Sequence, residues 1–340
     1  MISGATPMPA APSARGSLCA DDAPGGPLAP GPQAAPDGVP TRGAHPALAA
    51  GALAPAALAR TAHAPGAGAV SSRHVDASRV RRGDAALVAD YRRLVELCPA
   101  LALTLLAAED PDPAPARGWH SAAELAADPA ALAEALAGES ARIAPLAAEH
   151  GTSPRPHVAA SRLLHHYVWS ACLLIAGPWH LARRVPVIDP RDLWLHAPTG
   201  DLALRPRAHR TLPGDDELRA ELRAAVVAHV EPLLTAFAGP TRRGTRALWG
   251  MVTDDLASAV WYLGRMLDQE AAAVAAAASV LPGGTQPLPG AADFRVLRGA
   301  DGLEHHTRTR LGCCLYYTIR PDSACLTCPR TSDEERLQRF

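Results

Sequence analysis

The stretch HVAASRLLHHYVWSACLLIA, residues 157–176, carries the most regular apolar pattern in the chain. Its large apolar side chains recur every three or four residues, a spacing that places them on one face of an α-helix. They are Leu163, Leu164, Tyr167, Val168, Ala171, Leu174 and Ile175. A stripe this broad is typical of a helix that packs into a protein core. Gly177-Pro178 follows directly and predicts the end of the helix at this point.

Helical signals also precede this stretch. An apolar pattern with helical spacing begins at about Asp84. Ser121 and Glu124 have the spacing of a capping box, in which each side chain bonds the other residue's backbone N–H. Asp128-Pro129 is an N-cap followed by proline at the first helical position, and it predicts a second short helix.

The pattern changes in residues 185–205. Apolar residues alternate there with polar or small ones, and Pro198-Thr199-Gly200-Asp201 is typical of a turn. This combination predicts a β-hairpin near 185–205.

Two long helices are expected after the hairpin. One spans about 215–237, with Pro232 kinking or ending it, and the other spans about 245–277. The chain is therefore predicted to be an α+β protein, predominantly helical, with a small antiparallel β element.

Composition divides the chain into three parts. No aromatic residue precedes Tyr91, and 12 of the 33 prolines lie in residues 1–70 among Ala and Gly. Such a stretch cannot bury enough apolar surface to offset the entropy of ordering it, so residues 1–80 are expected to be a disordered extension. Residues 81–290 are expected to form the helical body, and residues 291–340 a short C-terminal metal-binding module.

Charge and hydropathy exclude some classes of protein. The chain has 33 basic residues, all Arg, and 34 acidic residues, which argues against a nucleic-acid binder. It has no uninterrupted apolar run of about 18 residues, so no transmembrane segment is expected. Residues 1–20 lack the basic start and apolar core of a secretory signal, and a cytoplasmic location is predicted.

Four of the seven cysteines lie in the last 30 residues, in GCCLYYTIRPDSACLTCP, residues 312–329. Clustered thiols favour a metal site over a disulfide scaffold, and four thiolates suit either a 2Fe–2S cluster or a structural zinc. Adjacent Cys313 and Cys314 are awkward ligands for one ion, because neighbouring side chains diverge in extended backbone. Two bridged irons relax that demand, so the 2Fe–2S cluster is favoured over zinc and over cysteines that bind no metal.

The remaining cysteines do not have ligand spacing. Cys98 and Cys172 lie at helical positions and are expected to be small buried hydrophobic residues. Cys19 is isolated near the start of the chain.

The spacing C-C-x10-C-x2-C near the C-terminus resembles that of the FhuF-like ferric-siderophore reductases. The resemblance is looser upstream, where the helix 161–176, the hairpin and the helical stretch 229–263 look like that family's helical body. It implies that Cys313, Cys314, Cys325 and Cys328 bind a 2Fe–2S cluster. It also implies a cytoplasmic oxidoreductase acting on metal ions, which passes one electron to siderophore-bound iron(III) and releases iron(II).

Two other functions remain open. One is a siderophore-binding or biosynthetic accessory protein with a structural zinc site, and the other is an iron–sulfur electron carrier with no chelate site. No flavin or nicotinamide motif is present in the sequence, so a separate electron donor is expected, either a ferredoxin or a flavin reductase.

Five residues outside the ligand set are candidates for redox tuning or substrate contact. Arg310, Arg320 and Arg330 flank the cysteines and would ease reduction or attract an anionic chelate, unless they are ordinary solvated arginines. His305 precedes the cysteines closely, and Trp249, beside Gly250, would line a substrate groove or simply pack.

Two adjacent polar pairs are expected to have no functional role. His165 and His166 would point about 100° apart on a helix, so they cannot easily share one metal ion. Asp254 and Asp255 are expected to form a solvated polar step on the helix that contains them.

Overall fold

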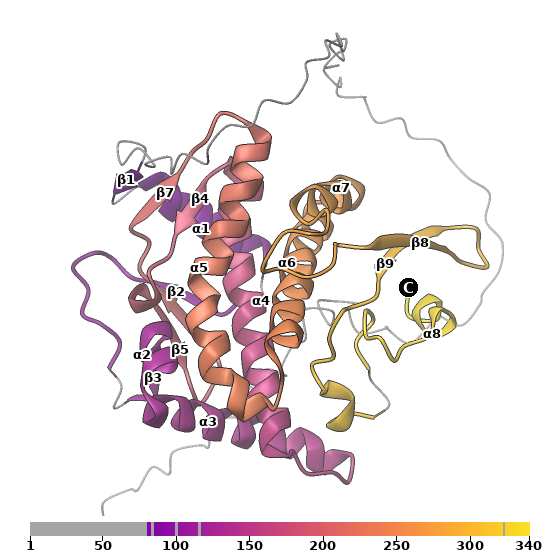
Figure 1. The fold of residues 1–340 in the computed structure, drawn as a ribbon, viewed down its shortest axis with the longest axis horizontal. Coiled ribbons are helices and arrows are strands. Elements are labelled where there is room, and N and C mark those ends of the chain that lie inside the picture. Colours follow the sequence, from indigo (N-terminus) through magenta and orange to yellow (C-terminus); the bar gives the residue numbers. More distant parts are fainter. Residues whose placement is uncertain (1–79, 83–84, 99–100, 115–116, 322–323) are drawn as a thin grey trace, which may run out of the picture. The chain divides into compact units, whose positions relative to one another are not determined.

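The structure is a computed structural model that describes residues 80–340, except 83–84, 99–100, 115–116 and 322–323 (Figure 1). These residues belong to one compact unit. The predicted extension up to residue 79, with Cys19, lies outside the described part.

Helices dominate the described part of the chain. The α-helices are α1 (Ala85–Leu97), α2 (Ala122–Ala127), α3 (Pro129–Glu149), α4 (Pro156–Ala182), α5 (Asp215–Thr241), α6 (Thr245–Met266), α7 (Glu270–Val280) and α8 (Asp333–Leu337). Helix α4 is the central one, because α1, α3, α5 and α6 all pack against it (Figure 1). Its side chains are buried almost without interruption from Val158 to Pro178, as the apolar pattern predicted.

The predicted end of α4 at Gly177-Pro178 is wrong, since the helix continues to Ala182. Gly177 instead permits close packing: a Cβ there would lie 2.6 Å from Cδ2 of Leu94 on α1. Beyond Ala182, the left-handed backbone of Arg183 (φ 55°) turns the N–H of Arg184 back to the carbonyl of Pro178 at 3.2 Å.

Several other helix boundaries differ from the prediction. The capping box of Ser121 and the N-cap of Asp128 are confirmed, but the helix after Asp128 has 21 residues and is not short. Helix α5 continues through Pro232 to Thr241. The predicted helix 245–277 is two helices, because the chain reverses at Asp268 (φ 55°).

The strands form three small sheets. Their bounds are β1 (Val80–Arg82), β2 (Leu103–Leu105), β3 (Trp119–Ser121), β4 (Val185–Val187), β5 (Leu193–His196), β6 (Leu202–Leu204), β7 (Ala208–Arg210), β8 (Phe294–Arg298) and β9 (Glu304–Arg308). The sheet orders are β1-β7-β4, β2-β6-β5-β3 and β8-β9. All pairings are antiparallel except that of β2 with β6, in which Leu103 lies opposite Leu202.

The predicted hairpin corresponds to β5 and β6, with Leu193 opposite Leu204. Strand β4 does not join it, because it pairs with β7 in another sheet. The fold class, a predominantly helical α+β protein with small and largely antiparallel sheets, is confirmed.

One helix in the described part, α5, is long and apolar enough to cross a membrane by length and composition. A helix that packs into a protein core passes the same test, and α5 buries Leu218, Leu222, Val226 and Leu233. Three acidic residues also occupy its first turn.

The C-terminal segment packs on the helical body. After the β8–β9 hairpin, it forms the short 3-10 helix η4 (Tyr316–Thr318) and then α8. Its buried cysteines, with Tyr316 and Ile319, form a second apolar core with Ile143 of α3 and Val158 of α4. Residues far apart in the sequence therefore surround the cysteines.

Candidate metal centre

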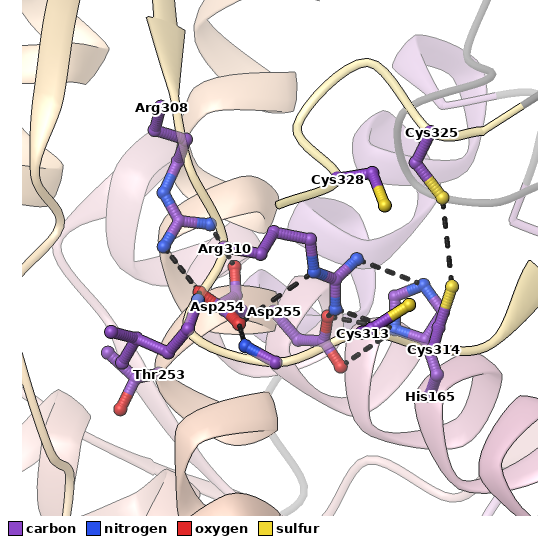
Figure 2. Close-up of polar contacts among 12 residues, drawn as sticks. His165, Thr253, Asp254, Asp255, Arg308, Arg310, Cys313, Cys314, Cys325 and Cys328 are labelled. Carbon is purple, nitrogen blue, oxygen red and sulfur yellow. Dashed lines mark hydrogen bonds and ion pairs between the residues drawn. The ribbon is translucent and has the colours of Figure 1, made fainter. Parts of the chain in front are cut away.

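The four C-terminal cysteines lie close together at one end of α4. Figure 2 shows their sulfur atoms turned toward one another, two from the segment after β9 and two from the turn before α8. Cys314, Cys325 and Cys328 are buried, whereas Cys313 is half-buried. Within the described part of the chain, no cysteine forms a disulfide.

The sulfurs approach in pairs. Sγ of Cys314 lies 3.6 Å from Sγ of Cys325, well beyond the length of a disulfide bond. Two thiolates on one tetrahedral metal, each about 2.3 Å from it, are about 3.8 Å apart, so this pair has the spacing of two ligands of one ion. Cys313 forms a hydrogen bond with Cys328. Burial raises the pKa of Cys313 to about 11; the N–H of Leu315 opposes this effect, and the sulfurs of Cys314 and Cys328 add to it. Across residues 80–340, gaps aside, no three His, Cys, Asp or Glu side chains form a group that could hold one metal ion.

Hydrogen bonds to backbone carbonyls fix the turn that carries Cys325 and Cys328. The N–H of Cys328 donates to the carbonyl of Cys325 at 3.0 Å, and the hydroxyl of Thr331 donates to the same carbonyl at 3.0 Å. The buried guanidinium of Arg336 donates to the carbonyl of Cys328 at 2.9 Å. This turn is therefore held by the protein itself.

The segment that carries Cys313 and Cys314 has an unusual backbone conformation at Leu315. Leu315 has a left-handed conformation (φ 66°), which costs free energy for a residue with a branched side chain. In this conformation, its N–H lies 3.4 Å from Sγ of Cys313 and donates to it. An amide directed at sulfur stabilises the thiolate form, which is the form that binds metal.

Asp254 of α6 anchors the segment that leads to Cys313. Its carboxylate accepts the backbone N–H groups of Leu311 at 3.0 Å and Gly312 at 2.9 Å. It also accepts a hydrogen bond from the guanidinium of Arg308 at 2.6 Å, and both side chains are fully buried (Figure 2). The prediction that Asp254 and Asp255 form a solvated step is wrong.

Asp255 belongs to a second buried group. Its carboxylate accepts from Arg310 at 2.7 Å and lies 3.0 Å from Nδ1 of His165 on α4 (Figure 2). His166 points in another direction, and its Nε2 lies 2.9 Å from the carbonyl of Gly200. The two adjacent histidines therefore diverge, as the sequence predicted. Arg310 is thus not a solvated arginine but joins the cysteine segment to α4 and α6.

Arg162 of α4 lies directly against the thiols. Its Nη1 is 3.7 Å from Sγ of Cys314, its guanidinium lies 4.7 Å from the ring centre of Tyr316, and its side chain is fully buried. Burial raises the pKa of Glu139, although the charges of Arg142 and Arg162 oppose this effect.

The other predicted candidates have different surroundings. Arg320 is half-buried, with Nη1 3.5 Å from the hydroxyl of Tyr316, and Arg330 is exposed over the ring of Tyr317 at 4.3 Å. His305 stacks on Phe340 with ring centres 4.5 Å apart. Trp249 is 6% exposed and borders a groove beside the cysteine segment.

The cysteines outside the ligand set behave as predicted. Cys98 and Cys172 are fully buried in the main core, and burial raises the pKa of each thiol. Neither lies with the four C-terminal sulfurs.

Sequence patterns did not reveal Arg162, His165, Asp254 or Asp255 as members of the site. One signal was available for the two aspartates. Residues 248–264 of α6 are buried without exception, and Asp254 and Asp255 are the charged residues among them. Carboxylates in the middle of such a helix must be buried, and buried charges require partners.

Comparison with protein-family models and with curated proteins gives no match to this chain.

Proposed function

We propose that the protein is an iron–sulfur oxidoreductase that reduces iron(III) bound by a siderophore, with a 2Fe–2S cluster held by Cys313, Cys314, Cys325 and Cys328. The observation that carries the proposal is that these four thiols lie side by side in two pairs, and that three of them are buried. Each iron of a 2Fe–2S cluster takes two protein thiolates, so pairwise approach suits this group.

The surroundings also suit a negatively charged group. With four thiolates the oxidised cluster would carry a charge of −2 and the reduced cluster −3. Arg162 contacts one sulfur and the N–H of Leu315 contacts another, so both a positive charge and a hydrogen-bond donor face the thiols. Such contacts set the reduction potential of an iron–sulfur site.

When bound, the cluster would supply one-electron transfer. Siderophores hold iron(III) through hard oxygen ligands, and iron(II), which has the lower charge, is held far more weakly. A single electron is therefore enough to release the metal. The chain's own residues would exclude water from three of the sulfurs and leave Cys313 partly exposed as the side that approaches a substrate.

The proposal includes a cytoplasmic setting and a separate electron donor, such as a ferredoxin or a flavin reductase. Both are inferred from the sequence. The reaction is balanced by that donor, which loses the electron that the chelated iron gains.

The visible spectrum of the protein tests the proposal. Protein purified without oxygen is expected to be red-brown, with two irons and two sulfides per chain, and to bleach partly on one-electron reduction. The reduced protein should then form iron(II) from a ferric siderophore, detected with an iron(II) indicator. A colourless protein with one zinc would overturn the proposal in favour of an accessory protein, and a coloured protein that reduces no chelate would be an electron carrier.

A further inference from the structure

A groove of about 540 Å³ lies between the first turns of α6 and the loop 284–290. Thr245, Arg246 and Trp249 line it from the helix, and Gln286, Pro287 and Leu288 from the loop. Its volume is in the range of small-molecule sites, and its mixture of an aromatic ring, apolar side chains and a few polar groups is typical of them. A folded protein partner would need a far larger surface.

The groove lies beside the segment that leads to Cys313. Leu311 packs against both of its walls: a Cβ added at Gly290 would lie 2.8 Å from Cδ1 of Leu311, and one at Gly250 would lie 3.5 Å from its Cβ. Cys313 is two residues further along the chain, so its Cα is at most about 7 Å from that of Leu311. Cys313 is also the half-buried member of the four cysteines.

One positive charge lines this groove. Arg246 is exposed there, and the described residues that line the groove include no Asp or Glu. Arg243, just before α6, donates a hydrogen bond from Nη2 to the carbonyl of Cys313. The groove also borders the first turn of α6, where the N-cap Gly244 provides no side-chain acceptor for the helix N–H groups.

We propose that this groove binds a negatively charged oxygen-donor chelate of a trivalent metal, with Arg246 contacting its oxygens and Trp249 its apolar part. The inference rests on the proposed function, because it names the class of substrate for the same site. It predicts that anionic chelates, such as tricatecholates or carboxylates, bind in preference to neutral trihydroxamates.

Gallium(III) complexes test the groove without any electron transfer, because gallium(III) has the charge of iron(III) but is not reduced under these conditions. Binding of a gallium tricatecholate (charge −3) and of a neutral gallium trihydroxamate to the full chain would be measured by calorimetry and by tryptophan fluorescence. We expect the anionic probe to bind more tightly, with an affinity that falls as salt is added.

Variants locate the site. Arg246→Gln should weaken binding of the anionic probe roughly tenfold, and Arg246→Glu more, because a charge-assisted hydrogen bond is lost and then replaced by repulsion. Arg92→Gln, which changes an exposed arginine on α1, is the matched control and should leave binding unchanged. Circular dichroism would establish that each variant is folded.

Three results would overturn the inference: no binding of the anionic probe, equal binding of the neutral probe, or unchanged binding by Arg246→Glu. The inference would also be overturned if the unmodified protein self-associates and Arg246→Glu makes it monomeric, because a second copy of the chain would then occupy the groove. Failure of the proposed function would appear in the visible spectrum and not in the binding of gallium. A colourless protein that still binds the gallium probe through Arg246 would support the groove and refute the reductase.

Discussion

The guanidinium of Arg162 lies 3.7 Å from Sγ of Cys314, although the two residues are 152 positions apart in the chain. Both side chains are buried, and the arginine also lies over the ring of Tyr316, which follows Cys314 closely. A buried positive charge in contact with a ligand sulfur acts at short range and with little screening by salt. Arg162, and not one of the three arginines in the cysteine segment, is therefore the first candidate for setting the potential of the site.

Replacing Arg162 should lower the reduction potential. In the proposed cluster, the reduced form has one more negative charge than the oxidised form, so a nearby positive charge favours the reduced state. Two unit charges about 8 Å apart at an effective dielectric near 20 interact by about 2 kcal/mol, so the loss of such a charge would lower a one-electron potential by roughly 90 mV. Redox titration of Arg162→Gln beside the unmodified protein measures it, and Arg162→Lys, which keeps the charge, should shift the potential less.

Arg320→Gln is the matched comparison. Arg320 lies between the two cysteine pairs in sequence, but its Nη1 faces the Tyr316 hydroxyl and its side chain is half-buried. Its removal should lower the potential by a smaller amount, because water screens its charge. A larger decrease for Arg320→Gln than for Arg162→Gln would contradict the assignment of Arg162.

Each of the four cysteines assigned to the proposed cluster should be needed for its visible absorption. Replacing Cys313, Cys314, Cys325 or Cys328 by Ser exchanges a soft thiolate for a hard hydroxyl, so the visible absorption should be lost or strongly changed. The spectrum and the iron content per chain measure this effect.

Cys98→Ser and Cys172→Ser are the controls, because both thiols lie in the main core away from the cluster. They should keep the spectrum while reducing stability, since a hydroxyl is then buried in an apolar environment. A normal spectrum in two of the four ligand variants would refute the ligand set.

The sequence and the structure agree where a signal is local. The capping box of Ser121, the N-cap of Asp128 and the buried face of α4 each depend on residues within a few turns of one another. The cysteine spacing likewise identified the four thiols that the structure brings together. The predicted end of α4 was wrong because Gly177 lies where the helix packs closely against Leu94, and the sequence of α4 alone does not reveal this contact.

The buried partners of the cysteine segment could not be predicted for the same reason. Arg310 meets Asp255 across 55 residues of sequence, and Arg308 meets Asp254 across 54. Such pairs form only once α6 and β9 are packed together. A charged residue looks solvated in a sequence until the element that buries it is known, and here that element comes from a distant part of the chain.

Asp254→Asn should destabilise the protein strongly. The substitution keeps the shape of the side chain but leaves the buried guanidinium of Arg308 without its opposite charge, and it weakens the bonds to the N–H groups of Leu311 and Gly312. Removing one partner of a buried ion pair costs about 3–5 kcal/mol of unfolding free energy. Urea unfolding, followed by circular dichroism, measures the loss.

Asp189→Asn is the control for a surface pair. Hydrogen bonding to Arg191 lowers the pKa of Asp189 to about 2, but Arg191 is 79% exposed. The change should therefore cost less than about 1 kcal/mol. A similar small cost for Asp254→Asn would mean that the buried pair does not hold the cysteine segment on α6.

Acid should destabilise the fold partly through His229. This fully buried side chain has its Nε2 2.9 Å from the hydroxyl of Tyr167 and its Nδ1 3.2 Å from the carbonyl of Ile188. A neutral ring with its proton on Nδ1 satisfies both neighbours, because it donates to the carbonyl and accepts from the tyrosine. A protonated ring would have a donor facing each of them and would lose the hydrogen bond from Tyr167.

The pH range of this effect follows from the difference in the pKa of His229 between the unfolded and the folded chain. Burial lowers the pKa of His229 in the folded protein from 6.5 to about 4. Between these values the unfolded chain binds a proton that the folded chain does not, so stability falls as the pH decreases from about 6.5 and the loss is complete below about 4. The difference corresponds to about 3 kcal/mol.

Melting temperatures measured between pH 7.5 and pH 5 test this contribution. His229→Gln keeps a donor and an acceptor but has no titrating group, so its melting temperature should decrease less with falling pH than that of the unmodified protein. His150→Gln, at the end of α3, also removes one histidine but keeps the bonds of His229, and it should retain the steeper dependence. Because the variants share the same cysteines, acid effects on the metal site cancel in the comparison. Equal slopes for His229→Gln and the unmodified protein would show that this histidine does not couple folding to pH.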